Sequence, residues 1–185
     1  TPTGTSNATN DRGIRANGVE GDPWNFTCTI EYITISSLGD ATDFGDTQFS
    51  FYGRGGNGSS SGTNERGIFW GGAVDPGTWP NPIRMDYITI NSTGDFGDEI
   101  ASMYGYDHAW GGCGSNSTNE RAFKSGGYGK NTGVEMNTIQ YITITSTGNA
   151  IDFGDLLETA MPNGAVTSGT DERAVIPGLG ADNDT

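Results

Sequence analysis

The amino-acid sequence predicts an all-β fold built from short antiparallel strands joined by many tight turns. Glycine accounts for 31 of the 185 residues, and hydrophobic residues make up only 32% of the chain. Disordered chains and turn-rich β-proteins both have compositions of this kind. Aromatic residues reach 10%, and runs such as "YITI" consist of residues that favour strands. These two observations favour the β-protein.

One phrase recurs three times and gives the order of the predicted elements. "EYITI", "DYITI" and "QYITI" contain Tyr32, Tyr87 and Tyr141, which are 55 and 54 residues apart. A second landmark, an acidic residue followed by arginine, occurs four times, and its spacings are 54, 55 and 52 residues: Arg12, Arg66, Arg121 and Arg173. Two landmarks with one period predict a tandem repeat.

Each predicted unit runs through the same elements. The arginine begins a short apolar strand that ends in glycine, as in "RGIFWGG" from Arg66. About 20 residues later comes the "YITI" strand, whose alternation of apolar and polar residues predicts a half-buried strand. We expect its isoleucines to point inward: Ile33, Ile35, Ile88, Ile90, Ile142 and Ile144. A polar turn follows, and then a Phe-Gly-Asp tag at Phe44, Phe96 and Phe153.

The landmarks divide the chain into three units of about 54 residues and one redundant strand. Residues 1–12 form an N-terminal tail and the start of the repeat strand. Residues 13–66, 67–121 and 122–173 are the three repeats, and residues 174–185 hold the last strand and a tail.

A small β-sheet that recurs about every 50 residues is typical of a propeller blade. The apolar run closed by glycines and followed by a tyrosine strand resembles the kelch repeat, although the tryptophan usual after that strand is missing. "DYITI" and "DFGDL" together with "RGIFWGG" are similar to kelch-like repeats in virion and surface proteins of aquatic phages and cyanobacteria. The resemblance extends from about Asn10 to Gly178. It implies propeller-type units and a structural or adhesive role.

The repeated arginines have two interpretations. They could line a pocket for an anionic ligand, or they could link neighbouring units through the planar guanidinium, which suits a bidentate partner. Their presence in every unit favours the structural interpretation. The natural partners are the equally repetitive carboxylates Asp46, Asp98 and Asp155.

Metal binding and catalysis find little support. Asp40, Asp43 and Asp46 follow one another at three-residue spacing and could offer oxygen ligands to calcium, but aspartate is also an ordinary residue of tight turns. We therefore expect no cofactor, with Ca²⁺ as the alternative. The single histidine, His108, has no serine or cysteine motif beside it, and no nucleophile, metalloprotease or phosphate-binding motif occurs. We expect a protein that is not an enzyme.

Two sets of residues are candidates for carbohydrate. The tryptophans could stack on sugar rings or fill gaps between sheets, and Trp79 in "PGTWPNP" is the better candidate for a ligand contact among Trp24, Trp70, Trp79 and Trp110. Sequons for N-glycosylation occur six times: Asn7, Asn25, Asn57, Asn91, Asn116 and Asn183.

The formal net charge of −14 predicts that the chain binds neither nucleic acid nor anionic membrane surfaces. No apolar run approaches the ~18 residues of a membrane helix, so we expect no membrane insertion. Cys28 and Cys113 could form one disulfide or remain two thiols, and the sequence leaves this open.

The function that these observations favour is a structural and adhesive repeat protein of an outer-surface assembly, such as a virion, tail fibre or appendage. We expect an extracellular or virion-surface location. The alternatives are a subunit of a glycosylated extracellular fibril and a carbohydrate-binding propeller-like module. Because three units do not readily close a ring, the expected partners are copies of the chain or adjacent structural subunits, together with surface glycans.

Overall fold

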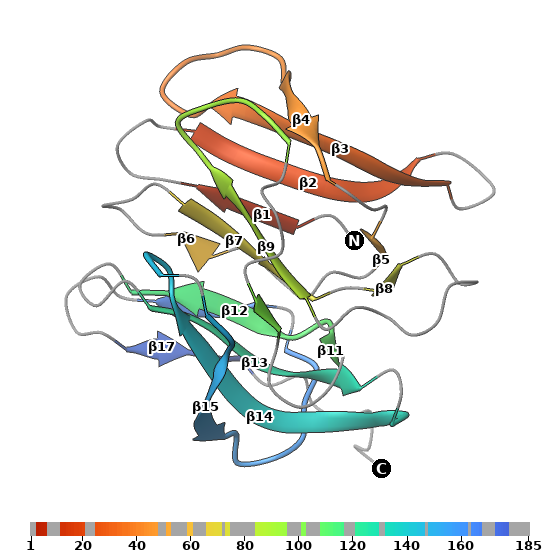
Figure 1. Ribbon diagram of the computed structural model, residues 1–185, viewed down its shortest axis with the longest axis vertical. Coiled ribbons are helices and arrows are strands. Elements are labelled where there is room, and N and C mark those ends of the chain that lie inside the picture. The colour runs from red at the N-terminus through yellow and green to blue at the C-terminus, as the bar shows by residue number, and fades with distance from the viewer. Residues whose placement is uncertain are drawn as a thin grey trace.

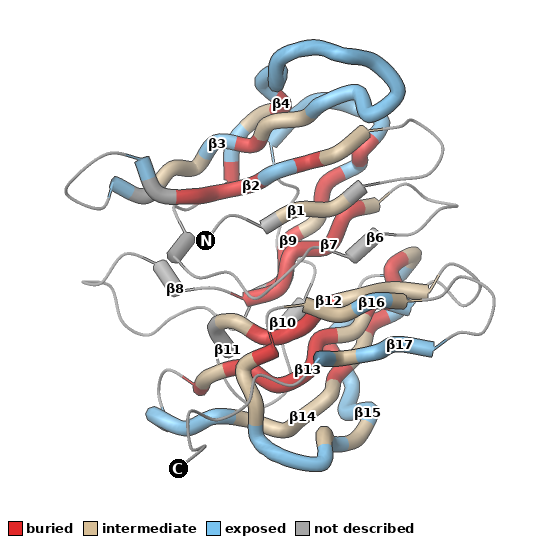
Figure 2. The backbone as a smooth tube through the Cα atoms, turned by 180° about the vertical axis from the view of Figure 1, so that it is seen from behind, coloured by how far each residue is buried: buried red, intermediate tan, exposed pale blue. Residues whose placement is uncertain are grey.

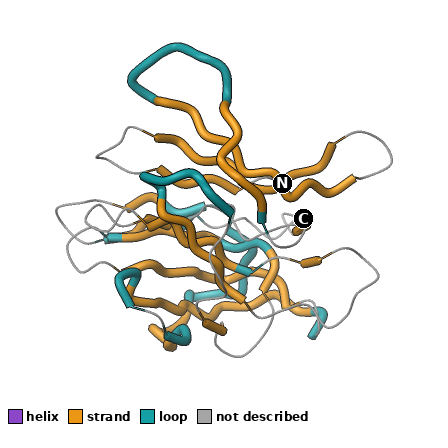
Figure 3. The backbone as a smooth tube through the Cα atoms, turned by 45° about the horizontal axis from the view of Figure 1, so that its top comes forward, coloured by secondary structure: helices purple, strands orange, loops and turns teal. Residues whose placement is uncertain are grey.

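The described residues form strands joined by turns and loops, without a helix among them, as the sequence predicts (Figure 3). The computed structural model describes residues 3–6, 12–20, 25–47, 51–52, 59–60, 66–71, 73–74, 84–95, 101–102, 108–116, 121–129, 132–146, 148–162, 164–167 and 173–177. In these ranges no helix is long and apolar enough to cross a membrane.

Three larger sheets are antiparallel and stack face to face (Figure 1). The first sheet has the order β1-β2-β3-β4, formed by Thr3–Ser6, Arg12–Glu20, Asn25–Thr34 and Thr42–Asp46. The second sheet has the order β10-β9-β7-β6, formed by Ala101–Ser102, Arg84–Thr89, Arg66–Trp70 and Ser59–Ser60. The third sheet has the order β11-β13-β14-β15, with β12 also on β13, formed by His108–Ala109, Arg121–Gly129, Val134–Thr143, Ile151–Asp155 and Gly112–Ser115.

Two short strand pairs complete the described chain. Phe51–Tyr52 (β5) pairs with Ala73–Val74 (β8). Val166–Thr167 (β16) pairs with Ala174–Val175 (β17), and we call this pair the C-terminal hairpin.

Four hairpins have the same register around the repeated arginines. The residue after each arginine pairs in turn with Ser6, Ser60, Ser115 and Thr167, in the pairs Ser6–Gly13, Ser60–Gly67, Ser115–Ala122 and Thr167–Ala174. The leading strands β1, β6, β12 and β16 also contact one another in that order. The C-terminal hairpin therefore packs against the third sheet in the same way that the hairpin of β6 and β7 packs against the first sheet.

In the first and third sheets the Phe-Gly-Asp tag is a β-bulge in the fourth strand, β4 or β15. The pairing of β3 with β4 skips Phe44, and the pairing of β14 with β15 skips Phe153. The glycine that follows has a positive φ, 150° at Gly45 and 139° at Gly154, which side chains rarely adopt. The bulge turns the phenylalanine ring toward the tyrosine of the neighbouring strand.

The core consists of two apolar layers between the sheets (Figure 2). Between the first and second sheets lie Ile14, Ala16, Ile30, Phe44, Phe69, Ile88 and Ile90, with Tyr32 packed against them. Between the second and third sheets lie Ile68, Trp70, Met85, Cys113, Ala122, Ile142, Ile144 and Ala150, with Tyr87 packed against them. The second sheet is thus covered on both faces.

The expectation that all six "YITI" isoleucines point inward is wrong for the first sheet. Ile88, Ile90, Ile142 and Ile144 are buried, whereas Ile33 is 46% exposed and Ile35 is 57% exposed. Alternation along a strand decides which residues share a face, but a face is buried only where a second sheet covers it. Among the sheets of the described residues, none lies on that face of β3.

Cys28 lies on β3 and Cys113 on β12, and they are not joined by a disulfide. Several residues singled out in the sequence lie outside the described ranges: Asn7, Asn57, Trp79, Phe96, Asp98 and Asn183. The carbohydrate-binding alternative rests on four tryptophans, of which Trp70 is buried, Trp110 is half-buried, and Trp24 and Trp79 lie outside the described ranges.

Candidate interaction faces at the two ends of the stack

The repeated arginines each lie over the repeated tyrosine of the same sheet. The guanidinium carbon is 4.7 Å from the ring centroid for Arg12 and Tyr32, 4.9 Å for Arg66 and Tyr87, and 4.8 Å for Arg121 and Tyr141. A guanidinium on a ring face is attracted by the π electrons. The common period of the two landmarks in the sequence comes from this contact.

Two of these arginines also join one sheet to the next. Arg12 donates from Nη1 to the carbonyl oxygen of Ile90 at 2.7 Å, and Arg66 donates to that of Ile144 at 3.3 Å. Among the described residues the Arg121 guanidinium has no carbonyl acceptor, because this part of the chain places no "YITI" strand below the third sheet. Arg12 and Arg66 thus each connect two sheets through a backbone carbonyl.

The predicted partners Asp46 and Asp155 do not pair with these arginines. The ion pair that the described residues form is Arg15 with Glu31, at 2.5 Å on the exposed face of the first sheet. The aspartate and the arginine both recur once in each unit, so the sequence could not show that the tag points its phenylalanine, not its carboxylate, toward the tyrosine. Arg173 is exposed and lies beside the third sheet.

The tag phenylalanines differ in burial although they make the same ring contact. The ring centroids of Tyr32 and Phe44 are 6.1 Å apart, and those of Tyr141 and Phe153 are 5.9 Å apart, both edge to face. Phe44 is 3% exposed, whereas Phe153 is 60% exposed. The difference arises because the second sheet covers Phe44.

The turn after β9 makes the cover over Phe44. The Gly94 amide donates to the carbonyl oxygen of Phe44 at 2.8 Å, and the Asp46 amide donates to Asp95 Oδ1 at 3.0 Å. The turn passes so close that a Cβ on Gly45 would collide with the carbonyl of Gly94, whereas a Cβ on Gly154 would meet open space. The tag of the third sheet thus has the shape for such a turn, but no turn of the described residues lies beside it.

A cavity of about 300 Å³ lies between this face of the third sheet and the C-terminal segment. The third sheet contributes Ser115, Asn116, Arg121, Phe123, Ile139, Tyr141 and Phe153 to its wall. The C-terminal segment contributes Thr167, Arg173, Ala174 and Ile176. We call Arg121, Phe123, Tyr141 and Phe153 the lower face.

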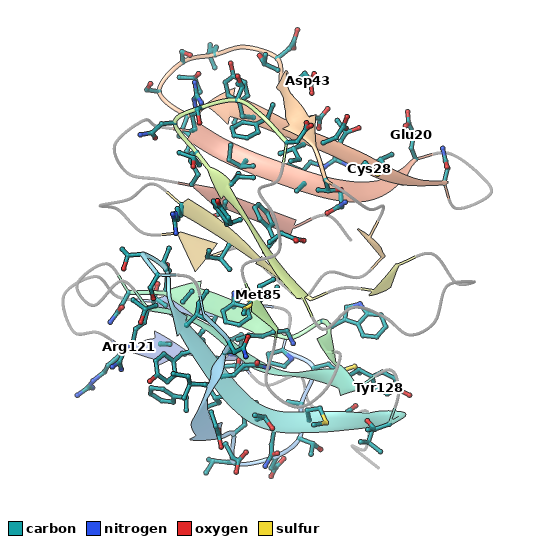
Figure 4. The ribbon with its side chains drawn as sticks, viewed as in Figure 1. Glu20, Cys28, Asp43, Met85, Arg121 and Tyr128 are labelled. Carbon is teal, nitrogen blue, oxygen red and sulfur yellow. The ribbon has the colours of Figure 1, made fainter. Side chains whose placement is uncertain are left out.

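The opposite end of the stack exposes the outer side of the first sheet. Ile33, Ile35 and Leu38 are exposed hydrophobic residues there, and we call them the upper face. Arg15 and Glu31 form their ion pair beside Ile33, and Asp40, in the following turn, and Asp43, on β4, are exposed. Figure 4 shows Asp43 and Arg121 on different sheets, with Met85 between the sheets.

A buried lysine lies between the second and third sheets. Lys124 is on the face of β13 that carries Ala122, and its Nζ donates to the carbonyl oxygen of Gly126 at 3.2 Å. Burial lowers the pKa of Lys124 to about 8, and burial raises the pKa of the neighbouring Cys113 to about 12. Each opposes part of the other's shift by charge attraction. No motif in the sequence marks this pair, which only strand pairing brings together.

The remaining candidate residues lie on the surface. Asp40, Asp43 and Asp46 are exposed, and the described residues contain no group of three acidic, histidine or cysteine side chains placed to hold a metal. Asn25 and Asn91 are exposed, while Asn116 is half-buried and accepts a hydrogen bond from the Arg121 amide at 3.1 Å.

No known protein family matches the chain, and no curated protein matches it. The assignment of a function therefore rests on the geometry of the faces.

Proposed function

We propose that the chain is a non-enzymatic structural and adhesive repeat protein of an outer-surface assembly. In this proposal its sheets are kelch-like, propeller-type units, and the described part of the chain contains three of them and the first hairpin of a fourth. The observation that carries the proposal is the arginine contact, which lies over a tyrosine in each of the three sheets and reaches the next sheet wherever one follows.

The positions of the exposed apolar residues support a structural role. The two ends of the stack are the places where "YITI" residues and tag residues are exposed, while the same residues are buried inside. A unit that can bury its apolar face only against a neighbour is typical of repeat arrays. An excess of acidic residues, 23 against nine basic ones, keeps such an array soluble.

Immunoelectron microscopy tests the location. Antibodies raised against the folded chain should label outer-surface assemblies on the particles or cells that make it. Particles or cells from which its gene has been removed serve as the control. Label confined to the cell interior would contradict the proposal.

A second candidate is a glycosylated extracellular fibril, favoured by the exposure of Asn25 and Asn91 within their sequons. Both side chains lie where a glycan would meet solvent. A glycan on Asn116 would enter the cavity wall. Intact mass before and after deglycosylation, followed by peptide mapping, should then show sugars on Asn25 and Asn91 and none on Asn116. An unchanged mass would exclude this candidate.

A further inference from the structure

We propose that the cavity under the third sheet is the seat of strand β3 from a second copy of the chain. The two copies would meet head to tail, with the upper face of one on the lower face of the other. This inference rests on the proposed structural function and names its partner and register.

The two inner interfaces provide the template for this docking. The isoleucine pair of β9, Ile88 and Ile90, packs in the layer with Tyr32, and the pair Ile142 and Ile144 packs in the layer with Tyr87. Tyr141 is the third tyrosine of the series and lines the cavity. The cavity therefore lies where the templates place an isoleucine pair.

In the templates, an arginine strand and its "YITI" partner lie side by side against the sheet above. The C-terminal hairpin supplies only the arginine strand below the third sheet. Ala174 and Ile176 face the cavity, as Gly67 and Phe69 face the first sheet in the template. In the first three sheets the arginine strand also pairs with a "YITI" strand, but β17 pairs within the described residues only with β16. Among the described residues, the place of the "YITI" strand below the third sheet is open.

The described part of the chain contains one such acceptor and one unused donor. Ile33 and Ile35 are the exposed members of the six isoleucines, so β3 is the strand whose pair remains available. One donor and one acceptor on opposite ends of the same molecule are complementary to each other, not to themselves. A second copy is thus the occupant that the surface of the chain itself supplies.

The template also predicts the polar contacts. Arg121 should donate to the carbonyl oxygen of Ile35 of the incoming copy, as Arg12 does to Ile90 and Arg66 to Ile144. The Gly39 amide should donate to the Phe153 carbonyl, as that of Gly94 does to Phe44.

The charges of the two faces are complementary. Arg121 of the third sheet lines the cavity, whereas Asp40, in the turn after β3, and Asp43, on β4, are exposed beside the upper face. In a chain with a net charge of −14, two copies repel each other over most orientations. Opposite charges at the two ends favour the head-to-tail approach.

Docking requires the C-terminal hairpin to leave its place. Strands β1 and β2 of the incoming copy would lie where β16 and β17 lie now, because the four hairpins share one register. The hairpin has two residues in each strand, and Val166 and Val175 remain exposed. It therefore competes weakly with a second copy.

Sedimentation of two matched variants tests the pairing of the faces. Ile35→Asp should disable the upper face, and Phe153→Asp should disable the lower face; both residues are exposed, so each variant should fold, as circular dichroism will check. Wild-type chain should associate beyond dimers at micromolar concentrations. Each variant alone should associate at least about tenfold more weakly.

A mixture of the two variants distinguishes the arrangement. The intact upper face of Phe153→Asp and the intact lower face of Ile35→Asp should form a dimer that grows no further. Val134→Asp, at a residue 52% exposed outside both faces, is the control and should assemble like the wild type. A monomeric wild type, or a mixture that stays monomeric, would overturn the proposal.

Ile176→Asp tests the competition by the hairpin. Weakening its packing on the third sheet should strengthen association severalfold, since the incoming copy then displaces less. Unchanged or weaker association would overturn this mode of docking. None of these outcomes bears on where antibodies locate the protein, so failure here leaves the proposed function standing on its own test.

Discussion

At one equivalent position of the three arginine strands, the residue type differs with the burial of the site. Arg15, Phe69 and Lys124 each stand three residues after the repeated arginine, and they pair with Glu31, Asp86 and Gln140 respectively. At the exposed end the position holds an ion pair, whereas in the first apolar layer it holds a phenylalanine. Lys124 is the exception, a fully buried amine.

The buried amine predicts an unusual dependence of stability on pH. The pKa of Lys124 is about 8 in the folded chain and 10.5 for a lysine in water, so the unfolded chain binds more protons between these values and stability rises with pH there. The pKa of Cys113 is about 12 against 9.0, so the folded chain binds more protons and stability falls across that range. Urea midpoints should rise from pH 8 to 9.0 and then flatten.

Two variants separate the contributions. Cys113→Ala should continue to gain stability toward pH 10.5, by about 3 kcal/mol in total. Lys124→Met should lose the rise above pH 8 and be at least as stable as the wild type at neutral pH, because no buried amine needs desolvation. The same profile in all three proteins would contradict the assignment.

The arginines should differ in their effect on stability. Arg66→Ala removes a ring contact and a charged hydrogen bond between sheets, and it should cost about 2 kcal/mol. Arg121→Ala removes the ring contact alone and should cost about 0.5 kcal/mol. Arg15→Ala, which breaks an exposed ion pair, is the control. Urea unfolding of dilute monomer measures all three, and equal losses for Arg66 and Arg121 would be unexpected.

At the scale of elements, nearly identical strands have different neighbours. β3, β9 and β14 carry the same "YITI" residues, yet one face of β3 is open to solvent while β9 is covered on both. Burial here depends on where a strand stands in the stack, not on its own sequence.

Paired substitutions in these strands test that conclusion. Ile88→Asp places an unpaired charge between two sheets and should cost about 3 kcal/mol or more. Ile33→Asp, at the same position of β3, should change stability by no more than about 0.5 kcal/mol. Urea unfolding in dilute solution, where copies remain separate, provides the comparison. A large loss at Ile33 would mean that its face is covered.

The strands and turns could be predicted because their signals are local. Alternation in "YITI" and the glycines of the tag need only a few neighbouring residues. The cavity could not be predicted, because Arg121, Tyr141 and Arg173 meet through strands far apart in sequence. The arginine partners were predicted as aspartates because charge suggests a carboxylate, whereas strand register places a tyrosine and a carbonyl there.

At the scale of the whole molecule, the sheets protect one another unequally. The second sheet lies between two apolar layers, whereas the outer face of the first sheet is open and that of the third is covered only in part by the C-terminal hairpin. The free energy of local unfolding is lowest in strands that lose few apolar contacts when they open.

Hydrogen exchange should reveal this gradient. Amides of β7 and β9 should exchange most slowly, since opening them disrupts both layers. Amides of β4 and β15, the edge strands that carry the tags, should exchange faster. Mass spectrometry of dilute protein gives the order, and equal protection of β7 and β4 would contradict it.

The variety at the position of Arg15, Phe69 and Lys124 has a consequence for how such a chain can evolve. An array of identical segments can gain or lose one by recombination and remain folded, because every junction is the same. In this chain, exchanging residues 13–66 with 122–173 would send Arg15 and Glu31 into the interior and Lys124 to the surface. The three segments are similar in shape but are not interchangeable, and their order along the gene has become part of the fold.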